Sequence, residues 1–202
     1  LRVDIEMIGM PNSKLLTIAV PAYNAASYLH TCLDSLVRSG DEVEVLVVND
    51  GSKDGTLQVA RDYAERYPGI VVAVDQENRN WGGAVNHALE LASGTFFYIV
   101  DSDDWLDSAK LTEVVSRLRM LEEQQAGVDL YMVNYVYNRV ENGDRHTISY
   151  EKLLPSDKVV GWDAMSNPSL DQYIMIHSAI YRTSVVRESG LVLPEGMSYM
   201  DS

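Results

Sequence analysis

Short apolar runs alternate with longer amphipathic stretches through the first hundred residues of the chain. The runs at residues 15–20, 43–48, 70–74 and 95–100 are rich in β-branched residues and read as strands. The stretches at 25–39, 53–67 and 83–92 carry apolar residues at helical spacing. Strands separated by helices of this length need crossover connections, so the pattern predicts a parallel sheet with helices on both faces.

The regular alternation of predicted strands and helices ends in the second half of the chain. Residues 107–125 predict a long helix capped by Asp107 or Ser108, and residues 128–136 predict a fifth strand. Asn142-Gly143 is typical of a hairpin turn. We also expect short strands at 146–152 and 159–162, a strand at 175–182 and a short helix at 184–189.

Charge and composition exclude several classes of protein. The formal net charge of -14 argues against nucleic-acid binding and against a broad basic face for anionic membranes. An acidic chain that binds an anionic ligand needs a local positive charge to offset the repulsion, and a divalent cation can supply it. No apolar run reaches the roughly 18 residues of a membrane span. Cys32 is the only cysteine, which excludes an internal disulfide, and it reads as a small buried hydrophobe rather than a nucleophile.

Polar clusters follow four of the predicted strands. They are PAYN at residues 21–24, NDGS at 49–52, DQENRN at 75–80 and DSDD at 101–104. Ligands of parallel α/β sheets bind beyond the carboxyl ends of the strands. Four such clusters at corresponding strand ends therefore predict a binding site at one edge of the sheet.

The last cluster indicates a cation. Asp101, Asp103 and Asp104 repel one another unless a cation or donors compensate them, and carboxylates are preferred ligands of Mg²⁺ and Mn²⁺. The alternative is an acidic start to the helix near Asp107, which the helix dipole favours. That alternative accounts for Asp104 but poorly for Asp101, which ends a strand.

The other clusters allow two interpretations each. Asp50 can accept hydrogen bonds from a nucleobase or ribose and Gly51 permits close approach, although the same residues form turns and helix caps. Trp81 and its two following glycines open a helix that is suited to a phosphate or sugar, or that is a plain helix start. His177 is expected to be a partly buried structural histidine, with contact to acceptor or phosphate as the alternative.

Four blocks together resemble the family-2 glycosyltransferases of the GT-A fold. They are TIAVPAYNAASYLHTCLDSL, VEVLVVNDGSKDGT, NWGGAVNHALELASGTFFYIVDSDDW and the late IHSAIYRTSVVRESGLVLPEG. The resemblance implies a Rossmann-like three-layer α/β/α sandwich with a mostly parallel central sheet. It also implies a nucleotide-sugar donor, most often a UDP-sugar, whose sugar is transferred to an acceptor hydroxyl with inversion.

The resemblance also assigns site residues by their positions in these blocks. The nucleoside pocket is expected to be lined by Pro21, Ala22, Tyr23, Asn24 and Asp50, and the diphosphate or donor sugar to lie near Asn80, Gly82 and Gly83. The donor is also expected to contact Asp101 and Ser102. Mn²⁺ or Mg²⁺ is expected to be bound by Asp101 and Asp103. The candidate catalytic base is Asp201. Met200 stands before it where the family usually has an acidic residue, which weakens that assignment.

The expected domain is a single unit over residues 1–202, with a donor-binding half at about 13–125 and an acceptor half at about 126–202, truncated at its end.

The expected acceptor is a saccharide or lipid-linked molecule of a bacterial polysaccharide, glycolipid or wall polymer. We expect a cytoplasmic location, with any peripheral membrane association through parts outside this chain. The alternatives are an inactive donor-binding domain and a nucleotidyltransferase, although the loop PAYNAASY lacks the basic residues of the latter.

Overall fold

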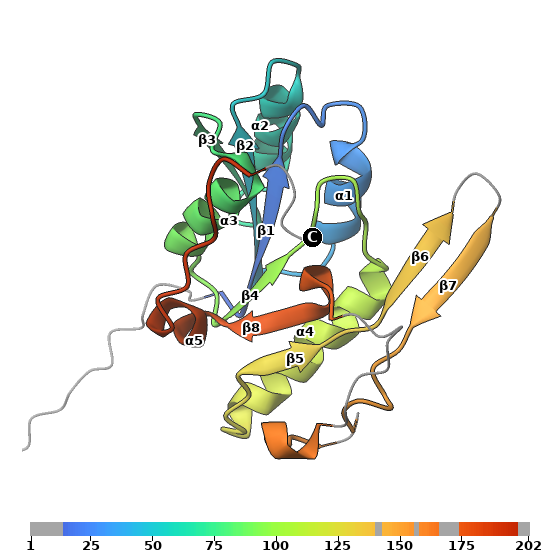
Figure 1. Ribbon diagram of the computed structural model, residues 1–202. Coiled ribbons are helices and arrows are strands. Elements are labelled where there is room, and N and C mark those ends of the chain that lie inside the picture. Colours follow the sequence, from blue (N-terminus) through green and yellow to red (C-terminus); the bar gives the residue numbers. More distant parts are fainter. Residues whose placement is uncertain (1–13, 140–142, 156–157, 166–173, 198–202) are drawn as a thin grey trace, which may run out of the picture.

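A six-stranded mixed sheet forms the centre of the molecule (Figure 1). The computed structural model describes residues 14–139, 143–155, 158–165 and 174–197. The strand order is β3-β2-β1-β4-β8-β5. The strands are β1 (Leu16–Ala22), β2 (Val43–Asp50), β3 (Val71–Gln76), β4 (Phe96–Ile99), β5 (Leu130–Met132) and β8 (Ala179–Arg182). The first four are parallel, and β8 runs antiparallel to both β4 and β5.

Helices cover both faces of this sheet, which confirms the expected α/β/α layers. The helices are α1 (Leu29–Leu36), α2 (Thr56–Arg66), α3 (Asn80–Leu91), α4 (Ser108–Glu123) and α5 (Thr183–Glu188). Apolar side chains of α1, α2 and α4 pack in one core cluster with Ile18, Val45 and Tyr98. Those of α3 pack in a second cluster on the other face, with Ala19 and Leu46. Successive strand residues point to opposite faces, so the continuous apolar runs supply both clusters.

The chain reverses direction across the sheet beside β1. From β1 it passes to β2 and β3 on one side, and α3 then carries it back over the sheet to β4 on the other side. Such a reversal leaves a crevice beyond the carboxyl ends of the two strands that flank it. The fold therefore predicts a crevice beyond β1 and β4, at the edge of the sheet where all four polar clusters lie.

Residues 128–136 do not form the single strand that their pattern predicts. The strand β5 ends at Met132, and β6 (Tyr135–Arg139) pairs with β7 (Asp144–Ile148) in a separate two-stranded sheet. Asn134 breaks the run, because its side-chain Oδ1 accepts the Tyr150 backbone N–H at 2.9 Å. The chain thus leaves the main sheet at this asparagine. Gly143, in the expected hairpin turn, has φ +74°, while residue 142 lies outside the described residues.

Three other expectations for the second half are corrected. The strand expected at 146–152 is β7, which begins at Asp144 and ends at Ile148. Residues 159–162 form no strand; a short 3-10 helix covers Trp162–Ala164, and Trp162 is 72% exposed, so no sheet partner covers it. The first part of 175–182 is also a 3-10 turn, at Ile176–Ser178, because the Ser178 Oγ–H donates to the Met175 carbonyl at 2.5 Å. Within the described residues, no helix is both long enough and apolar enough to cross a bilayer.

Candidate functional site

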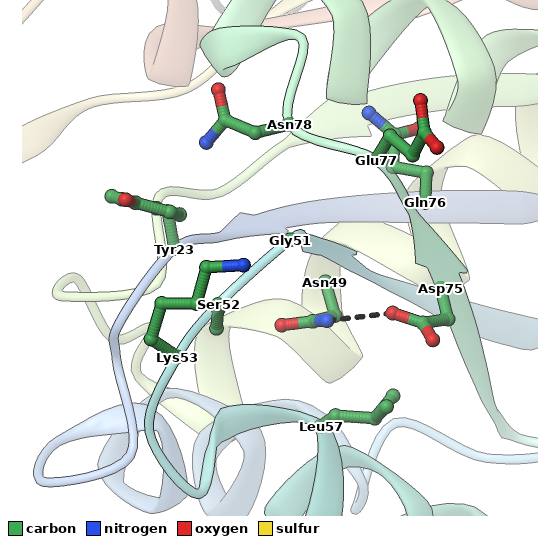
Figure 2. Close-up of a pocket in the computed structure, with 10 residues that line it drawn as sticks. All are labelled: Tyr23, Asn49, Gly51, Ser52, Lys53, Leu57, Asp75, Gln76, Glu77 and Asn78. Atoms are coloured by element: carbon green, nitrogen blue, oxygen red, sulfur yellow. Dashed lines mark hydrogen bonds between the residues drawn. The ribbon is translucent and has the colours of Figure 1, made fainter.

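A pocket of about 580 Å³ opens beyond the carboxyl ends of β1, β2 and β3 (Figure 2). It is lined by Tyr23, Asn49, Gly51, Ser52, Lys53, Leu57, Asp75, Gln76, Glu77 and Asn78. The volume lies within the range of roughly 300–1,000 Å³ that is usual for small-molecule sites. Of the residues expected to line a nucleoside pocket, Tyr23 lies in this wall and is 51% exposed. The remaining lining residues come from the last residues of β2 and β3, the loops that follow these strands, and the first turn of α2.

The loops after β1 and β2 are joined directly to each other. The Asn24 backbone N–H donates to Ser52 Oγ at 2.9 Å, and the Lys53 N–H donates to Asn24 Oδ1 at 2.8 Å. Asn24 has φ +50°, a left-handed conformation that asparagine tolerates better than most residues. We call these two bonds the loop latch. Pro21 and Ala22 are buried within β1 beneath it, so they support the loop from inside the sheet.

Asn49 presents an unusual polar group in the pocket wall. Its Nδ2 donates to Asp75 Oδ1 at 2.7 Å, which fixes the amide, because the reversed amide would set two oxygens against each other. Asn49 is 2% exposed, and its Oδ1 has no hydrogen-bond partner among the described residues. An unpaired buried carbonyl is costly, so this wall is suited to a ligand or water that donates a hydrogen bond.

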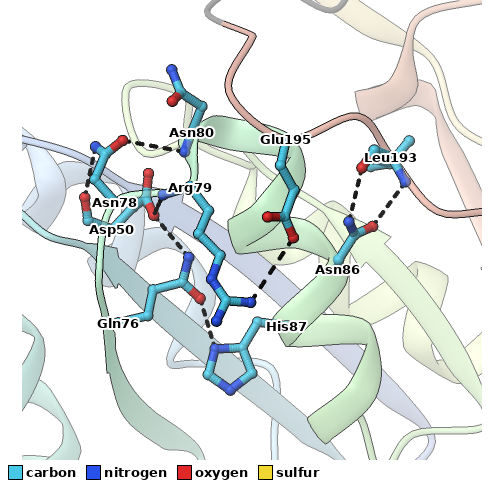
Figure 3. Close-up of polar contacts among 9 residues, drawn as sticks. All are labelled: Asp50, Gln76, Asn78, Arg79, Asn80, Asn86, His87, Leu193 and Glu195. Carbon is cyan, nitrogen blue, oxygen red and sulfur yellow. Dashed lines mark hydrogen bonds and ion pairs between the residues drawn. The ribbon is translucent and has the colours of Figure 1, made fainter.

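Asp50 faces the opposite side of β2 from Asn49, as strand alternation requires. Its Oδ1 accepts from Gln76 Nε2 at 2.7 Å and from the Arg79 backbone N–H at 2.8 Å (Figure 3). Gln76 in turn contacts His87 Nδ1 at 2.7 Å, and because its amide N–H₂ faces Asp50, the His87 Nδ1 must donate. Asp50 therefore holds the loop after β3 in place.

Gly51 has a geometric reason to be glycine. Its φ is +68°, and a Cβ placed there would lie 2.8 Å from the Asn78 backbone nitrogen. The Asn78 Nδ2 donates to the Asp50 carbonyl at 2.9 Å, so the two loops touch at this point. Any side chain at residue 51 would push apart the walls of the pocket.

Three potential metal ligands meet beyond β4. One ligand atom each of Asp101, Asp104 and His177 lies within 4.8 Å of the others. Asp101 Oδ1 also accepts the Trp81 indole N–H at 2.7 Å. Asp103, the second expected ligand, is exposed and lies outside this group, and the neighbouring Ser102 is buried. We call Asp101, Asp104 and His177 the acidic group.

His177 reaches the acidic group because β8 is antiparallel to β4. The register pairs Tyr98 with Ile180, so the start of β8 lies beside the end of β4. The Tyr98 hydroxyl donates to the His177 carbonyl at 2.7 Å, and the Tyr135 ring packs edge-on against the imidazole at 4.8 Å between centroids. Sequence alone gave no direction for this strand, so the meeting of His177 with the aspartates could not be foreseen.

The electrostatics of this corner are those of crowded carboxylates. Removal from water raises the pKa of Asp104, and the charges of Asp101 and Asp103 raise it further, whereas His177 lowers it. Burial also raises the pKa of the Cys32 thiol strongly, with the same aspartates contributing. Cys32 is thus an inert buried thiol, as expected. The crowded aspartates favour a compensating positive charge beside them.

These residues suit a divalent cation. Around an ion bound to oxygen at about 2.1 Å, ligand atoms lie roughly 3–4 Å apart, so the acidic group needs only small side-chain shifts to close on one. Two carboxylates fit Mg²⁺ or Mn²⁺, and an imidazole fits Mn²⁺ better than Mg²⁺. The rise in the Asp104 pKa shows the unfavourable charge that an ion would relieve.

The glycines at the start of α3 have packing partners. A Cβ on Gly82 would clash with the Pro194 carbonyl oxygen, and one on Gly83 would clash with the Arg79 side chain. Both glycines are buried, and Asn80 begins the helix at φ +63°. Close packing therefore accounts for the two glycines without a ligand. Asp201, the candidate base, lies outside the described residues.

Comparison with known proteins agrees with the resemblance of the four sequence blocks. The model of the family described as Glycosyl transferase family 2 matches residues 17–185. The uncharacterized glycosyltransferase MG025 of Mycoplasma genitalium is 38% identical over 101 residues, covering 48% of this chain and 34% of that protein. The uncharacterized glycosyltransferase YibD of Escherichia coli K12 is 25% identical over 196 residues, covering 95% of this chain and 55% of that protein.

A solved structure shares the fold. S. aureus TarS 1–349 in complex with UDP-GlcNAc superimposes with a TM-score of 0.62 at 22% identity, covering 91% of this chain and 49% of TarS 1–349. At that identity the likeness concerns the fold alone. The chain thus spans about a third of MG025 and about half of YibD and of TarS 1–349.

Proposed function

This chain belongs to glycosyl transferase family 2, and on that premise we propose that it binds a UDP-sugar and transfers the sugar to an acceptor hydroxyl with inversion. The observation that carries the proposal is the adjacency of two features at one sheet edge. The pocket lies beyond β1 to β3, and the acidic group lies beyond β4, which is the neighbour of β1. A nucleoside in the pocket would therefore extend its diphosphate toward the aspartates.

The pocket wall has the chemistry for a nucleoside. Asn49 and Asp75 present oxygen acceptors that suit a nucleobase N–H or a ribose hydroxyl, and Tyr23 offers an aromatic face. Lys53 supplies a positive charge at the rim. That TarS 1–349 holds UDP-GlcNAc supports the choice of UDP for this chain.

The proposed cation would be held by Asp101 together with a second carboxylate. The family resemblance assigns Asp103 to that place, whereas the structure groups Asp104 and His177 with Asp101. A bound Mn²⁺ or Mg²⁺ would supply Lewis-acid neutralisation of the diphosphate leaving group. The chain's own part is to hold Asp101, and the Trp81 indole N–H does so at 2.7 Å.

The proposed reaction is a single displacement. An acceptor oxygen attacks the anomeric carbon as the bond from that carbon to the diphosphate oxygen breaks, and the acceptor proton passes to a carboxylate base. Asp201 remains the candidate for that base. Tyr135 contacts His177, and its ring packs edge-on against that of Tyr137 at 5.2 Å between centroids; this aromatic pair supports a saccharide acceptor at that side of the site.

The first test is calorimetric titration of UDP-GlcNAc in the presence and absence of Mn²⁺. We expect Asp101→Asn to weaken Mn²⁺-dependent binding at least about 10-fold, because it removes the charge shared by both proposed ligand sets. Asp62→Asn, an exposed change on α2, is the matched control and should leave affinity unaltered. Unaltered affinity in the Asp101 variant would remove the proposed cation site.

The second carboxylate is assigned by the same titration. Loss of Mn²⁺ dependence in Asp103→Asn supports the assignment by resemblance, whereas loss in Asp104→Asn supports the acidic group of the structure.

The rival function is a domain that binds donor without transfer. Slow Mn²⁺-dependent hydrolysis of UDP-GlcNAc would exclude that rival, since a pure binding domain releases no UDP.

A further inference from the structure

The chain after α5 crosses back over the first half of α3 (Figures 1 and 3). We call residues 193–196 the strap. Asn86 on α3 binds the strap in both directions: its Nδ2 donates to the Leu193 carbonyl at 2.9 Å, and its Oδ1 accepts the Leu193 N–H at 3.0 Å. One side chain thus satisfies both backbone groups of a residue more than a hundred positions away.

Packing holds the strap in the same place. The Leu193 side chain packs against the apolar cluster that α3 forms with the sheet. The Pro194 carbonyl lies directly on Gly82, where no side chain could fit. Two independent contacts, one polar and one steric, therefore fix the strap against α3.

The far end of the strap meets the first turn of α3. The Gly196 N–H donates to the Arg79 carbonyl at 3.1 Å. The same turn contacts two carboxylates: the Arg79 N–H donates to Asp50 Oδ1, which holds the loop after β3, and the Trp81 indole donates to Oδ1 of Asp101, a member of the acidic group. Asn80, between them, is held in the left-handed region. This turn is thus held by the strap on one side and by the carboxylates on the other.

We infer that Asn86 is a positioning residue: by fixing the strap, it fixes the first turn of α3 and thereby the placement of Asp101 and of the pocket-lining loop after β3 for donor binding. The inference rests on the proposed function. Neither Asn86 nor Leu193 lines the pocket or belongs to the acidic group. An effect of Asn86 on the donor must therefore be indirect, through the strap and the start of α3.

The experiment compares two variants that loosen opposite ends of α3. Asn86→Leu removes both bonds to the strap at similar side-chain size. Arg187→Leu is the matched control, since Arg187 joins α5 to the other end of α3 through the Leu89 and Ala92 carbonyls at 2.6 and 2.8 Å. Thermal unfolding gives the stability of each variant, and calorimetry with UDP and Mn²⁺ at 20 °C gives its affinity.

We expect both variants to unfold at lower temperature, but only Asn86→Leu to bind UDP more weakly, by about 3- to 30-fold. Leu193→Ala, which loosens the strap from its own side, should weaken UDP binding in the same direction. It also serves as the second variant if Asn86→Leu does not fold.

Three outcomes overturn the inference. Equal affinity of the wild-type and strap variants removes the positioning role while the proposed function stands. An equal loss of affinity in Arg187→Leu makes the effect one of general stability. Absence of UDP binding by the wild-type chain removes the proposed UDP donor, and the positioning role falls with it.

Discussion

At the scale of single residues, the surroundings of Asp104 raise the pKa of its carboxyl group. Loss of water raises its pKa above the ordinary 3.8, and two neighbouring aspartates add to that rise. The folded chain therefore holds the Asp104 proton more tightly than the unfolded chain does. Ionisation of this group costs stability as the pH rises from its ordinary pKa through the folded one.

Asp104→Asn should accordingly stabilise the metal-free protein at pH 7.5 and lose that advantage at pH 3, below the ordinary pKa of 3.8, where Asp104 is protonated in both the folded and the unfolded chain. Because Asp104 is an exposed residue whose charge is screened by solvent, we expect a gain of only about 1–3 °C in the melting temperature at pH 7.5. Thermal melts in EDTA at the two pH values measure the difference. A gain that is equal at both values would mean that the effect is not electrostatic.

Individual site residues were predictable only in part. Asp101 stands out in the sequence because it directly follows an apolar strand, and Tyr23 follows one in the same way; the structure places both at the sheet edge. Asn49 was overlooked because its neighbour Asp50 carries the charge, yet strand alternation turns Asn49 into the pocket and Asp50 away from it. His177 required the direction of β8, which no local pattern contains.

At the scale of elements, α4 shows how one side chain defines a helix start. Asp107 precedes the helix with an extended backbone, and its Oδ1 accepts from the Ala109 and Lys110 N–H groups at 2.9 and 3.1 Å. These donors have no partner within the helix, so the carboxylate replaces one. The predicted choice between Asp107 and Ser108 is settled in favour of Asp107.

Asp107→Ala should destabilise the protein by about 1 kcal/mol, because two helix N–H groups lose their acceptor. In a chain of this size the melting temperature would fall by roughly 2–4 °C. Glu113→Ala, which removes only an exposed pair with Lys110 on the same helix, is the control and should change little. A loss in the control that matches the loss in Asp107→Ala would contradict the cap.

The first four strands and the four longer helices were predictable because their apolar periodicity is strong and local. Strands β5 and β6 were not separable, since residues 128–136 read as one strand. The bond from the Tyr150 N–H to Asn134 divides that run, and it joins residues that are sixteen apart. A long-range polar contact of this kind leaves no trace in periodicity.

At the scale of the whole molecule, the hairpin of β6 and β7 projects from the main sheet (Figure 1). It carries Tyr135, which contacts His177, and the exposed Val136 and Tyr137. An exposed aromatic next to the proposed donor site is suited to a saccharide, because sugar rings pack on aromatic faces. The hairpin thus extends the proposed site on the acceptor side.

Tyr137→Ala should lower transfer to a saccharide acceptor by about 10-fold or less, in proportion to one lost aromatic contact. UDP-GlcNAc hydrolysis and UDP affinity should stay at the wild-type values, because Tyr137 does not line the pocket. A radiolabelled transfer assay with and without acceptor separates the two activities. Parallel loss of both would place Tyr137 in the fold rather than at the acceptor.

The loop latch between Asn24 and residues 52 and 53 has a consequence for engineering. A segment grafted after β1 from a protein without an asparagine at this position would not accept the Lys53 N–H as Asn24 does. The two loops are therefore one exchangeable module. Chimeras that swap both together should keep a formed pocket, and chimeras that swap either one alone should not.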